Sequence, residues 1–320
     1  MQMRTIGETT IAVTPIGMGC WPIVGITSVD VTEAHSLATL EAAFEAGVNF
    51  FDTAYCYGYD GESERMIARA LGKERDKIII ASKGGLHWDN GTQVSDASPE
   101  RILRQCEESL KRLQTECIDL YYLHAPDPNT PISRTAEAFR NLLDTGKVRS
   151  VGLSNCTTTQ LEEFAAVCPI AACQPHYNML QREIERDLLP WCQSHQISIV
   201  AYWPLMKGLL AGKLARSHQF AAKDGRAKYP MFQGDEWHKN QDFLDELRAL
   251  SQQTGYSVAQ IVINWTIQQP GITVALCGAK RPEQIRENAA ALSWELTDEQ
   301  MQRIDAAIQT RGPVISRAAV

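Results

Sequence analysis

Several features that would assign this 320-residue chain to a particular class of protein are missing from it. No apolar run approaches the eighteen or so residues that a membrane-spanning helix needs, and the opening MQMRTIGETT lacks the apolar stretch of a signal peptide. The formal net charge of −7 disfavours nucleic acid and anionic membranes as partners, since both attract basic surfaces. The nine cysteines include no CxxC pair, so we expect reduced thiols and a cytoplasmic location.

What is present is an ordinary globular composition, 44% hydrophobic and 22% charged. Eight short apolar runs predict strands at 14–19, 48–53, 77–83, 118–124, 148–154, 171–175, 197–203 and 272–278. Most of them do not alternate with polar residues, which is typical of strands buried on both faces of a parallel sheet. Amphipathic patterns between the strands predict helices at 33–46, 62–71, 99–113, 133–144, 157–167 and 182–194.

Eight strand–helix units without a second set of strands predict a single closed (β/α)8 barrel, a TIM barrel, covering residues 1–320 as one domain. A doubly wound open sheet is the main alternative. Residues 1–12 are expected to add an N-terminal hairpin. After the seventh strand we expect a long loop over 204–236 and extra C-terminal helices, at 240–253, 257–268 and 297–309.

Barrels of this kind carry their chemistry at the C-terminal ends of the strands. An aspartate, a cluster of tyrosines, a lysine and a histidine follow three neighbouring predicted strands: Asp52, Tyr55, Tyr57, Lys83 and His124. A lysine near a tyrosine favours the phenolate and is expected to lower the phenol's pKa from about 10. Asp52 would then hold the ammonium of Lys83, and His124 would either orient a carbonyl or take part in the proton path.

Other chemistries lack their motifs. The seven histidines are scattered singly, which disfavours a metal site, and neither G-x-S-x-G nor a pair of strand-end glutamates occurs. No G-x-G-x-x-G follows a strand, and GLLAGKL (208–214) has the wrong spacing and a leucine where a P-loop needs Ser or Thr. Proton transfer by a phenol is the chemistry that remains.

The stretch FDTAYCYGYDGESE (51–64) resembles the D-T-A-x-x-Y-G-x…S-E signature of the aldo-keto reductase superfamily. Further segments are similar to its other signatures, in the same order along the chain: ASKGG, YYLHAPD, VGLSNC, CQPHYN, AYWPL and CGAKRPEQIRENAAA. The last of these resembles the branch of the superfamily with a G-A-K/R…Q…N cofactor segment. The resemblance runs from about residue 3 to 310.

The resemblance implies that Tyr57, five residues after Asp52 and directly before a glycine, is the general acid. Asp52 and Lys83 would tune it, and His124 would position the substrate carbonyl. Tyr55 and Tyr59 would be packing or pocket-wall residues. The implied reaction is reduction of an aldehyde or ketone by hydride transfer from a nicotinamide.

The implied cofactor is NADP(H), with use of NAD(H) left open. Ser154, Asn155 and Gln174 would hold the nicotinamide carboxamide and Tyr202 would stack on its ring; alternatively, Ser154 and Asn155 cap a helix and Tyr202 is a core residue. The other positions of the implied cofactor segments are Gly19, Cys20, Trp21, Asp52, Trp203, Pro204, Leu205, Lys207, Gly208, Gly278, Lys280, Gln284 and Asn288.

Two segments are expected to meet the cofactor's phosphates. Lys280 or Arg281 would pair with an adenosine 2′-phosphate, although Gly278 and Gln284 stand where other reductases place a lysine and an arginine. The loop at 205–230 is locally basic, with a single acid, Asp224. Its cations suit phosphates or are simply solvated, and they are Lys207, Lys213, Arg216, Lys223, Arg226 and Lys228.

The carbonyl substrate is expected to lie among five side chains, namely Trp21, Tyr57, His87, Trp88 and His124. Four cysteines fall near the same mouth, where their oxidation would inhibit the enzyme unless they are apolar filler: Cys20, Cys56, Cys156 and Cys277.

Two interpretations compete with a reductase. One is a nucleotide-binding accessory subunit of the kind found with ion channels, which the filled catalytic positions and the lack of an N-terminal inactivating segment disfavour. The other is oxidation, dehalogenation or isomerisation on the same barrel. The sequence does not indicate the oligomeric state.

Overall fold

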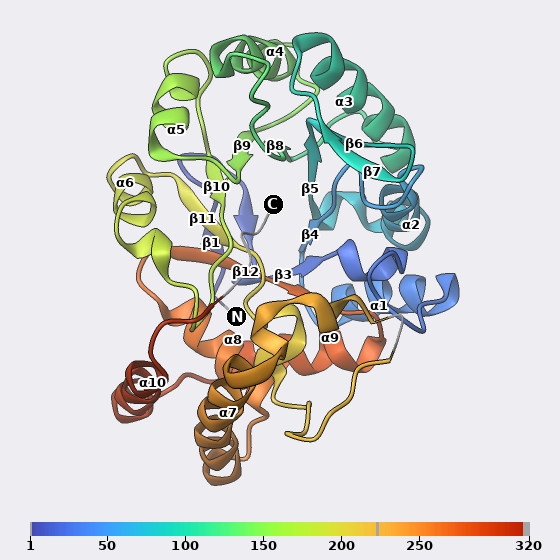
Figure 1. Cartoon of the computed structure of the whole chain (residues 1–320). Coiled ribbons are helices and arrows are strands. Elements are labelled where there is room, and N and C mark those ends of the chain that lie inside the picture. Colours follow the sequence, from blue (N-terminus) through green and yellow to red (C-terminus); the bar gives the residue numbers. More distant parts are fainter. Residues whose placement is uncertain (1, 222–223, 316–320) are drawn as a thin grey trace.

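A computed structural model describes residues 2–221 and 224–315 of the chain. Eight parallel strands close into a barrel in which each pairs with the next in sequence and the last pairs with the first (Figure 1). The strands are β3 (Ile16–Gly19), β4 (Phe50–Asp52), β5 (Ile79–Gly84), β8 (Leu120–Leu123), β9 (Val151–Ser154), β10 (Ala172–Gln174), β11 (Ser198–Ala201) and β12 (Ile272–Gly278). The predicted closed barrel is confirmed, and the open sheet is wrong.

Helices surround the barrel as an outer ring (Figure 1). They are α1 (Glu33–Glu45), α2 (Glu62–Leu71), α3 (Pro99–Leu113), α4 (Ile132–Asp144), α5 (Thr158–Ala165), α6 (Leu188–Ser194), α7 (Gly234–Thr254), α8 (Val258–Gln268), α9 (Pro282–Ala289) and α10 (Asp298–Arg311). Local sequence starts several of them. Capping boxes begin α5, α8 and α10 at Thr157, Ser257 and Thr297, each paired with a glutamine three residues later.

The prediction misplaces two helices and misses one hairpin. Helix α7 begins at Gly234, inside the predicted loop, and the predicted helix at 182–194 is a 3-10 turn at Glu183–Glu185 followed by α6, which the Asp187 side chain caps. An unpredicted hairpin, β6 (Leu86–Asp89) with β7 (Thr92–Ser95), follows β5. Its turn is Asn90-Gly91, with φ of 48° and 80° at the two residues, which is a strong local hairpin signal.

The apolar residues form an inner and an outer layer. Phe50, Leu120, Val200 and Val274 belong to one buried cluster with residues of the N-terminal hairpin, and Phe51, Tyr121 and Ile199 to another with the helices. Neighbouring strand residues such as Phe50 and Phe51 fall in different layers because side chains alternate across a sheet. The strands are therefore buried on both faces, as predicted.

The predicted N-terminal hairpin is present as β1 (Arg4–Thr5) and β2 (Ala12–Val13). Its side chains Ile6, Ile11 and Val13 are buried against the inner layer, so the hairpin closes the N-terminal end of the barrel. Arg4 anchors it by donating hydrogen bonds to the carbonyls of Ile267 (2.8 Å), Ile272 (2.8 Å) and Thr273 (3.2 Å).

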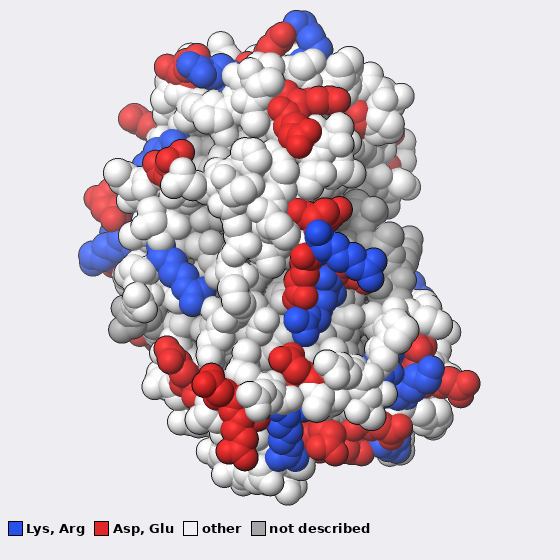
Figure 2. Space-filling model, turned by 90° about the vertical axis from the view of Figure 1, so that its left-hand side faces the viewer, with Lys and Arg blue, Asp and Glu red and all other residues white. Residues whose placement is uncertain are grey.

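Charges of both signs are interspersed on the face of the molecule shown in Figure 2, and no continuous basic patch is seen on it. Within residues 2–221 and 224–315, no helix combines the length and apolar character needed to cross a membrane.

We expect Arg4→Met to lower the free energy of unfolding by about 1–3 kcal/mol, because three carbonyls at the barrel floor lose their charged donor. Urea unfolding followed by circular dichroism measures this. Arg140→Met is the control, since among the described residues Arg140 pairs only with Asp144, one turn along its own exposed helix face, and the urea midpoint of this variant should hardly move. Equal midpoints for the two variants would contradict the anchoring role of Arg4.

Candidate active site

A buried ion pair lies at the C-terminal ends of two neighbouring strands. Asp52 ends β4, and Lys83 is the fifth residue of β5. Lys83 Nζ lies 2.5 Å from Asp52 Oδ1 and also donates to the carbonyl of Thr53 at 2.8 Å. The second carboxylate oxygen accepts a 2.7 Å hydrogen bond from Gln174 Nε2 at the end of β10. Both residues are almost completely buried, with 1% of Lys83 and 2% of Asp52 exposed.

Tyr57 lies above this pair in the β4–α2 loop. Its ring packs edge-on between Trp21 (centroids 5.1 Å apart) and His124 (5.8 Å), and Lys83 Nζ is 4.9 Å from its centroid. The next residue, Gly58, has φ of 95°, and a Cβ there would lie 2.0 Å from a carboxylate oxygen of Glu62. The tight turn that directs Tyr57 inward therefore requires glycine. The structure brings all four predicted catalytic residues together.

The electrostatics of Tyr57 differ from the expectation. Burial, followed by the negative charge of Asp52, raises the pKa of Tyr57 well above its ordinary value, whereas Lys83 was expected to lower it. Burial is the largest cause, and the carboxylate of Asp52, which holds the Lys83 ammonium at 2.5 Å, adds to it. Tyr57 is thus a phenol that retains its proton at neutral pH.

His124 follows β8 directly and is nearly buried. Burial and the nearby charge of Lys83 lower the pKa of His124 well below its ordinary range, so its imidazole is neutral at pH 7. Its Nδ1 lies 3.6 Å from the Cys56 thiol, and its backbone carbonyl accepts a 3.0 Å hydrogen bond from Asn155 Nδ2. A neutral imidazole can donate one hydrogen bond to a ligand oxygen.

A second polar group continues around the mouth from β9 to β11. Ser154 Oγ donates to the carbonyl of Gln174 at 2.7 Å, and Tyr202 donates to Asn155 Oδ1 at 2.8 Å. Helix α5 is capped by Thr157, so the alternative that Ser154 and Asn155 cap it is wrong. Tyr202 is half-buried rather than a core residue. These hydroxyl and amide groups fit the donor and acceptor pair of a carboxamide, and the exposed part of the Tyr202 ring fits a flat ring.

The segment after Tyr202 has an unusual backbone. Trp203, Met206, Lys207 and Gly208 all adopt left-handed conformations, with φ of 61°, 45°, 55° and 86°. Such residues cluster where a backbone is shaped for a ligand. Lys207 Nζ lies over the rings of Trp203 (4.2 Å) and Tyr229 (4.7 Å), while Pro204 is buried and Leu205 half-buried.

The remaining predicted cofactor residues lie at and after the ends of β12 and β3, the next strands around the barrel from β11. Gly278, which is exposed, pairs in register with Gly19. Gln284 Oε1 accepts from the backbone N–H of Lys280 at 3.0 Å, and Lys280 Nζ donates to the carbonyl of Val29 at 2.8 Å. The α9 residue Asn288 is buried.

Three of the six cations of the basic loop are held by carboxylates. Lys213 pairs with Glu287 at 2.6 Å, and Arg226 pairs with Asp224 at 2.7 Å. Arg216 pairs with Asp242 and Asp245 on α7. Lys228 lies 5.8 Å from the Tyr229 ring centroid, and Lys223 lies outside the described residues. The cations that were expected to meet phosphates or to be solvated are therefore, in three cases, paired with carboxylates of the chain itself.

The predicted pocket walls come from two segments. Trp88 lies on the unpredicted hairpin, donates to the Cys56 carbonyl at 2.9 Å and packs against exposed Tyr59 with centroids 4.9 Å apart. Trp21 donates to Thr27 Oγ1 at 2.7 Å. The buried Nδ1 of His87 has no hydrogen-bond partner in the described part of the chain, and burial and Arg101 lower the pKa of His87. No group of three or more metal-ligating side chains occurs among the described residues.

Of the four mouth cysteines, Cys20, Cys56 and Cys277 are buried, and Cys156 is half-buried. Burial raises the pKa of all three buried thiols, that of Cys56 to about 12. Burial and a raised pKa both favour a role as apolar filler over reaction as thiolates. Cys156 is instead in thiol contact with buried Cys173, and both line a cavity of about 250 Å³ beside Asn155.

We expect maleimide to label Cys117 and Cys156 first in the folded protein, because these two of the described cysteines are partly exposed. Cys20, Cys56 and Cys277 should react only after unfolding. Mass spectrometry of peptides from timed reactions measures this order. Labelling of Cys20 as fast as Cys117 would show that the mouth thiols are more accessible than their burial indicates.

A barrel of eight parallel strands with this polar group at its C-terminal mouth is the architecture of an oxidoreductase class. The Aldo/keto reductase family model matches residues 15–309, and the chain belongs to this family. It is 36% identical to Aldo-keto reductase YhdN of Bacillus subtilis (strain 168) over 312 residues, 97% of this chain and 94% of the relative.

Two solved structures are similar over nearly the whole chain. The glycerol dehydrogenase AKR11B4 from Gluconobacter oxydans is 33% identical with a TM-score of 0.91, covering 99% of this chain and 98% of that one. The aldo-keto reductase AKR11C1 from Bacillus halodurans, in its holo form, is 27% identical with a TM-score of 0.78, covering 100% and 98%. The protein is thus an oxidoreductase of a family that reduces small carbonyl compounds with nicotinamide cofactors.

Proposed function

We propose that this protein reduces aldehydes or ketones to alcohols with NADP(H), and that Tyr57 is the general acid. The observation that carries the proposal is the placement of Tyr57, held between Trp21 and His124 directly above the buried Lys83–Asp52 pair. A phenol in this position can deliver a proton to a carbonyl oxygen that lies between it and His124. The family membership supports the same reaction.

Each residue of the group has a distinct task in this proposal. Tyr57 retains its proton because burial and Asp52 raise its pKa, and His124, being neutral, donates a hydrogen bond that orients the carbonyl. As the proton leaves Tyr57, the ammonium of Lys83, 4.9 Å from the ring centroid, stabilises the developing negative charge. Asp52 holds that ammonium in place.

The cofactor supplies hydride to the carbonyl carbon when it is bound. Ser154, Asn155 and Gln174 would hold its carboxamide, and the half-exposed ring of Tyr202 would support one face of its nicotinamide. The left-handed backbone from Trp203 to Gly208, with Lys207, would lie along its phosphates.

The preference for NADP(H) rests on Lys280 and the exposed Arg281. Either cation can pair with a 2′-phosphate, and Lys280 would exchange its hydrogen bond to the Val29 carbonyl for that charge-assisted contact. If these two side chains contribute little to binding, the protein also uses NAD(H), which lacks the 2′-phosphate.

The substrate is proposed to enter between Trp21 and Trp88, with His87 alongside. Aromatic walls favour an apolar or aromatic aldehyde, because burial of such a group against indole rings removes much apolar surface from water. The alternative of a nucleotide-binding accessory subunit is not favoured, since the relatives named above are named as enzymes.

We expect purified protein to oxidise NADPH, and more slowly NADH, in the presence of 4-nitrobenzaldehyde, measured as loss of absorbance at about 340 nm. Tyr57→Phe should lower kcat by about 100-fold or more, because the proton donor is removed. Tyr59→Phe is the matched control, an exposed tyrosine on the same loop, and should keep near-normal turnover.

Equal activities of the two tyrosine variants would contradict the assignment of Tyr57. Tight NADPH binding without turnover of any carbonyl tested would favour the accessory-subunit alternative.

We also expect kcat/KM for carbonyl reduction to stay level between about pH 6 and 9. A general acid acts while protonated, and the pKa of Tyr57 is raised, so activity is lost only as the pH rises through that elevated value, above about 10. The pKa of His124 is lowered, so it gains a proton only below its usual range. A titration centred near pH 7 would contradict the neutral state of His124.

A further inference from the structure

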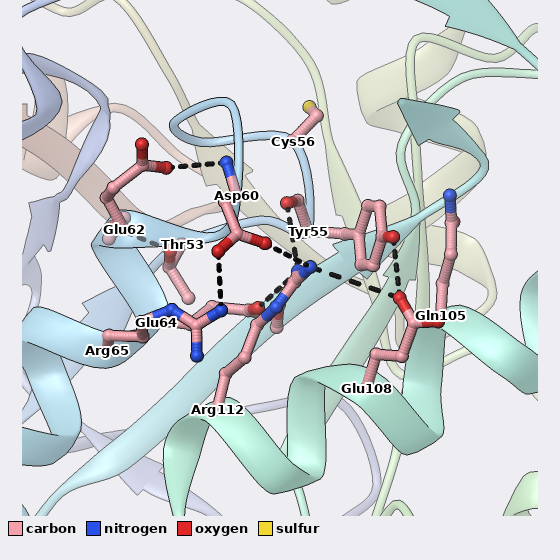
Figure 3. Close-up of polar contacts among 12 residues, drawn as sticks. Thr53, Tyr55, Cys56, Asp60, Glu62, Glu64, Arg65, Gln105, Glu108 and Arg112 are labelled. Atoms are coloured by element: carbon pink, nitrogen blue, oxygen red, sulfur yellow. Dashed lines mark hydrogen bonds and ion pairs between the residues drawn. The ribbon is translucent and has the colours of Figure 1, made fainter. Parts of the chain in front are cut away.

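A polar network lies behind the loop that carries Tyr57, on the side of the strands that faces the helices (Figure 3). Its centre is Arg112, in the last turn of α3, whose side chain is only 11% exposed. The guanidinium carbon lies 4.4 Å from the centroid of the Tyr55 ring, and Nη1 donates to the Tyr55 carbonyl at 3.5 Å. Arg112 thus contacts both the side chain and the backbone of Tyr55, which lies two positions before Tyr57.

Arg112 is itself fixed by a buried carboxylate. Glu64, in the first turn of α2, is fully buried and lies 3.4 Å from Arg112 Nη1. Its other oxygen accepts a 2.7 Å hydrogen bond from Ser82, the residue directly before Lys83 on β5. The Arg112–Glu64 pair therefore joins α3 to α2, which follows the loop at 53–61, and through Ser82 to β5.

Tyr55 has further contacts that restrict it. Its hydroxyl donates to Glu108 Oε2 at 2.6 Å, one turn before Arg112 on α3, and its backbone N–H donates to the carbonyl of Lys83 at 3.0 Å. The ring, the hydroxyl and both backbone polar groups of Tyr55 are therefore engaged. In Figure 3 the Tyr55 side chain points toward Glu108.

The end of the loop is shaped around the same guanidinium. Gly61 has φ of 70°, and a Cβ at this position would lie 2.6 Å from the Arg112 side chain. Exposed Asp60 lies 3.6 Å from Arg112 Nη2. The guanidinium thus contacts the loop at its beginning, through Tyr55, and at its end, through Asp60, with Tyr57 in between.

We propose that Arg112 is a positioning residue for the reaction, holding the loop at 53–61 so that the Tyr57 hydroxyl stays in place between His124 and Lys83. This inference rests on the proposed role of Tyr57 as proton donor. Its physical basis is that a shift of the order of 1 Å in a proton donor costs up to about 100-fold in rate. In the described part of the chain the polar contacts of Arg112 are with Tyr55, Asp60, Glu64 and Glu108 and not with the four proposed catalytic residues, so it acts on Tyr57 through the loop.

We expect Arg112→Met to lower kcat by about 10- to 100-fold. The KM for 4-nitrobenzaldehyde and the Kd for NADPH, from quenching of tryptophan fluorescence, should change by no more than about twofold, because Arg112 lies outside the proposed binding surfaces. The solvent deuterium isotope effect on kcat should increase, since proton transfer from a displaced phenol becomes limiting. Hydrogen–deuterium exchange should rise in the peptide covering 53–61.

Removing Arg112 also leaves the buried carboxylate of Glu64 without its cation, which lowers the stability of the protein whatever its effect on the reaction. The double variant Arg112→Met/Glu64→Gln removes that charge as well and should regain thermal stability without regaining kcat. Arg112→Lys keeps a cation for Glu64 but lacks the planar fork that meets both the ring and the carbonyl of Tyr55. We expect it to fold normally and to recover only part of the rate.

Arg75→Met is the matched control. Arg75, in the 3-10 turn Gly72–Lys77 before β5, pairs with buried Asp119 at 2.8 Å and donates to the Cys117 carbonyl at 2.8 Å, at the opposite end of the barrel from Tyr57. The Arg75→Met variant should lose stability as Arg112→Met does, but should keep the wild-type kcat and the wild-type rate of hydrogen–deuterium exchange in residues 53–61.

Unchanged kcat in Arg112→Met, or equal loss of kcat in both arginine variants, overturns the inference. If wild-type protein turns over no carbonyl, the proposed reaction fails, and hydrogen exchange alone decides the role of Arg112. Faster exchange of 53–61 in Arg112→Met than in Arg75→Met then still supports its hold on the loop, and equal exchange overturns it.

Discussion

The buried ion pair of Lys83 and Asp52 is the interaction on which the rest of the mouth depends. Transferring two charges from water to a protein interior costs several kcal/mol for each ion, so such a pair persists only with good geometry and further hydrogen bonds. Both conditions are met, because Lys83 also donates to Thr53 and Gln174 donates to the second oxygen of Asp52. The pair thus connects the ends of β4, β5 and β10, which are not all neighbours in the barrel.

The same pair explains the protonation states around it. Burial, followed by the carboxylate of Asp52, raises the pKa of Tyr57 and keeps the phenol protonated. Burial and the nearby ammonium of Lys83 both lower the pKa of His124, so its imidazole stays neutral. One buried pair therefore leaves two neutral hydrogen-bond donors facing the same space, which suits recognition of an uncharged carbonyl oxygen.

The fold and the central residues of the site could be predicted from the sequence because they depend on local patterns. Apolar runs marked the strands, and the residue type at each strand end placed Asp52, Lys83 and His124 together once the barrel was assumed. The errors concern contacts between distant segments. No local pattern indicates that Lys213 pairs with Glu287, 74 residues away, or that burial and Asp52 together raise the pKa of Tyr57. The β6–β7 hairpin is different, since its Asn90-Gly91 turn was visible in the sequence.

Arg112 also could not be recognised from the sequence, because its spacing on α3 is that of any arginine near the end of a helix. The role proposed for Arg112 becomes clear when its contact with buried Glu64 is compared with that between Arg75 and buried Asp119. Asp119 lies below the strands, where Arg75 and Arg149 hold it at 2.8 and 2.6 Å. Glu64 and Arg112 lie beside the loop that carries Tyr57. Side chains at the N-terminal end of a barrel serve stability, whereas the C-terminal end carries the chemistry. The same pair of chemical groups therefore has different consequences at the two ends, and only the pair beside Tyr57 is in a position to affect the rate of a reaction.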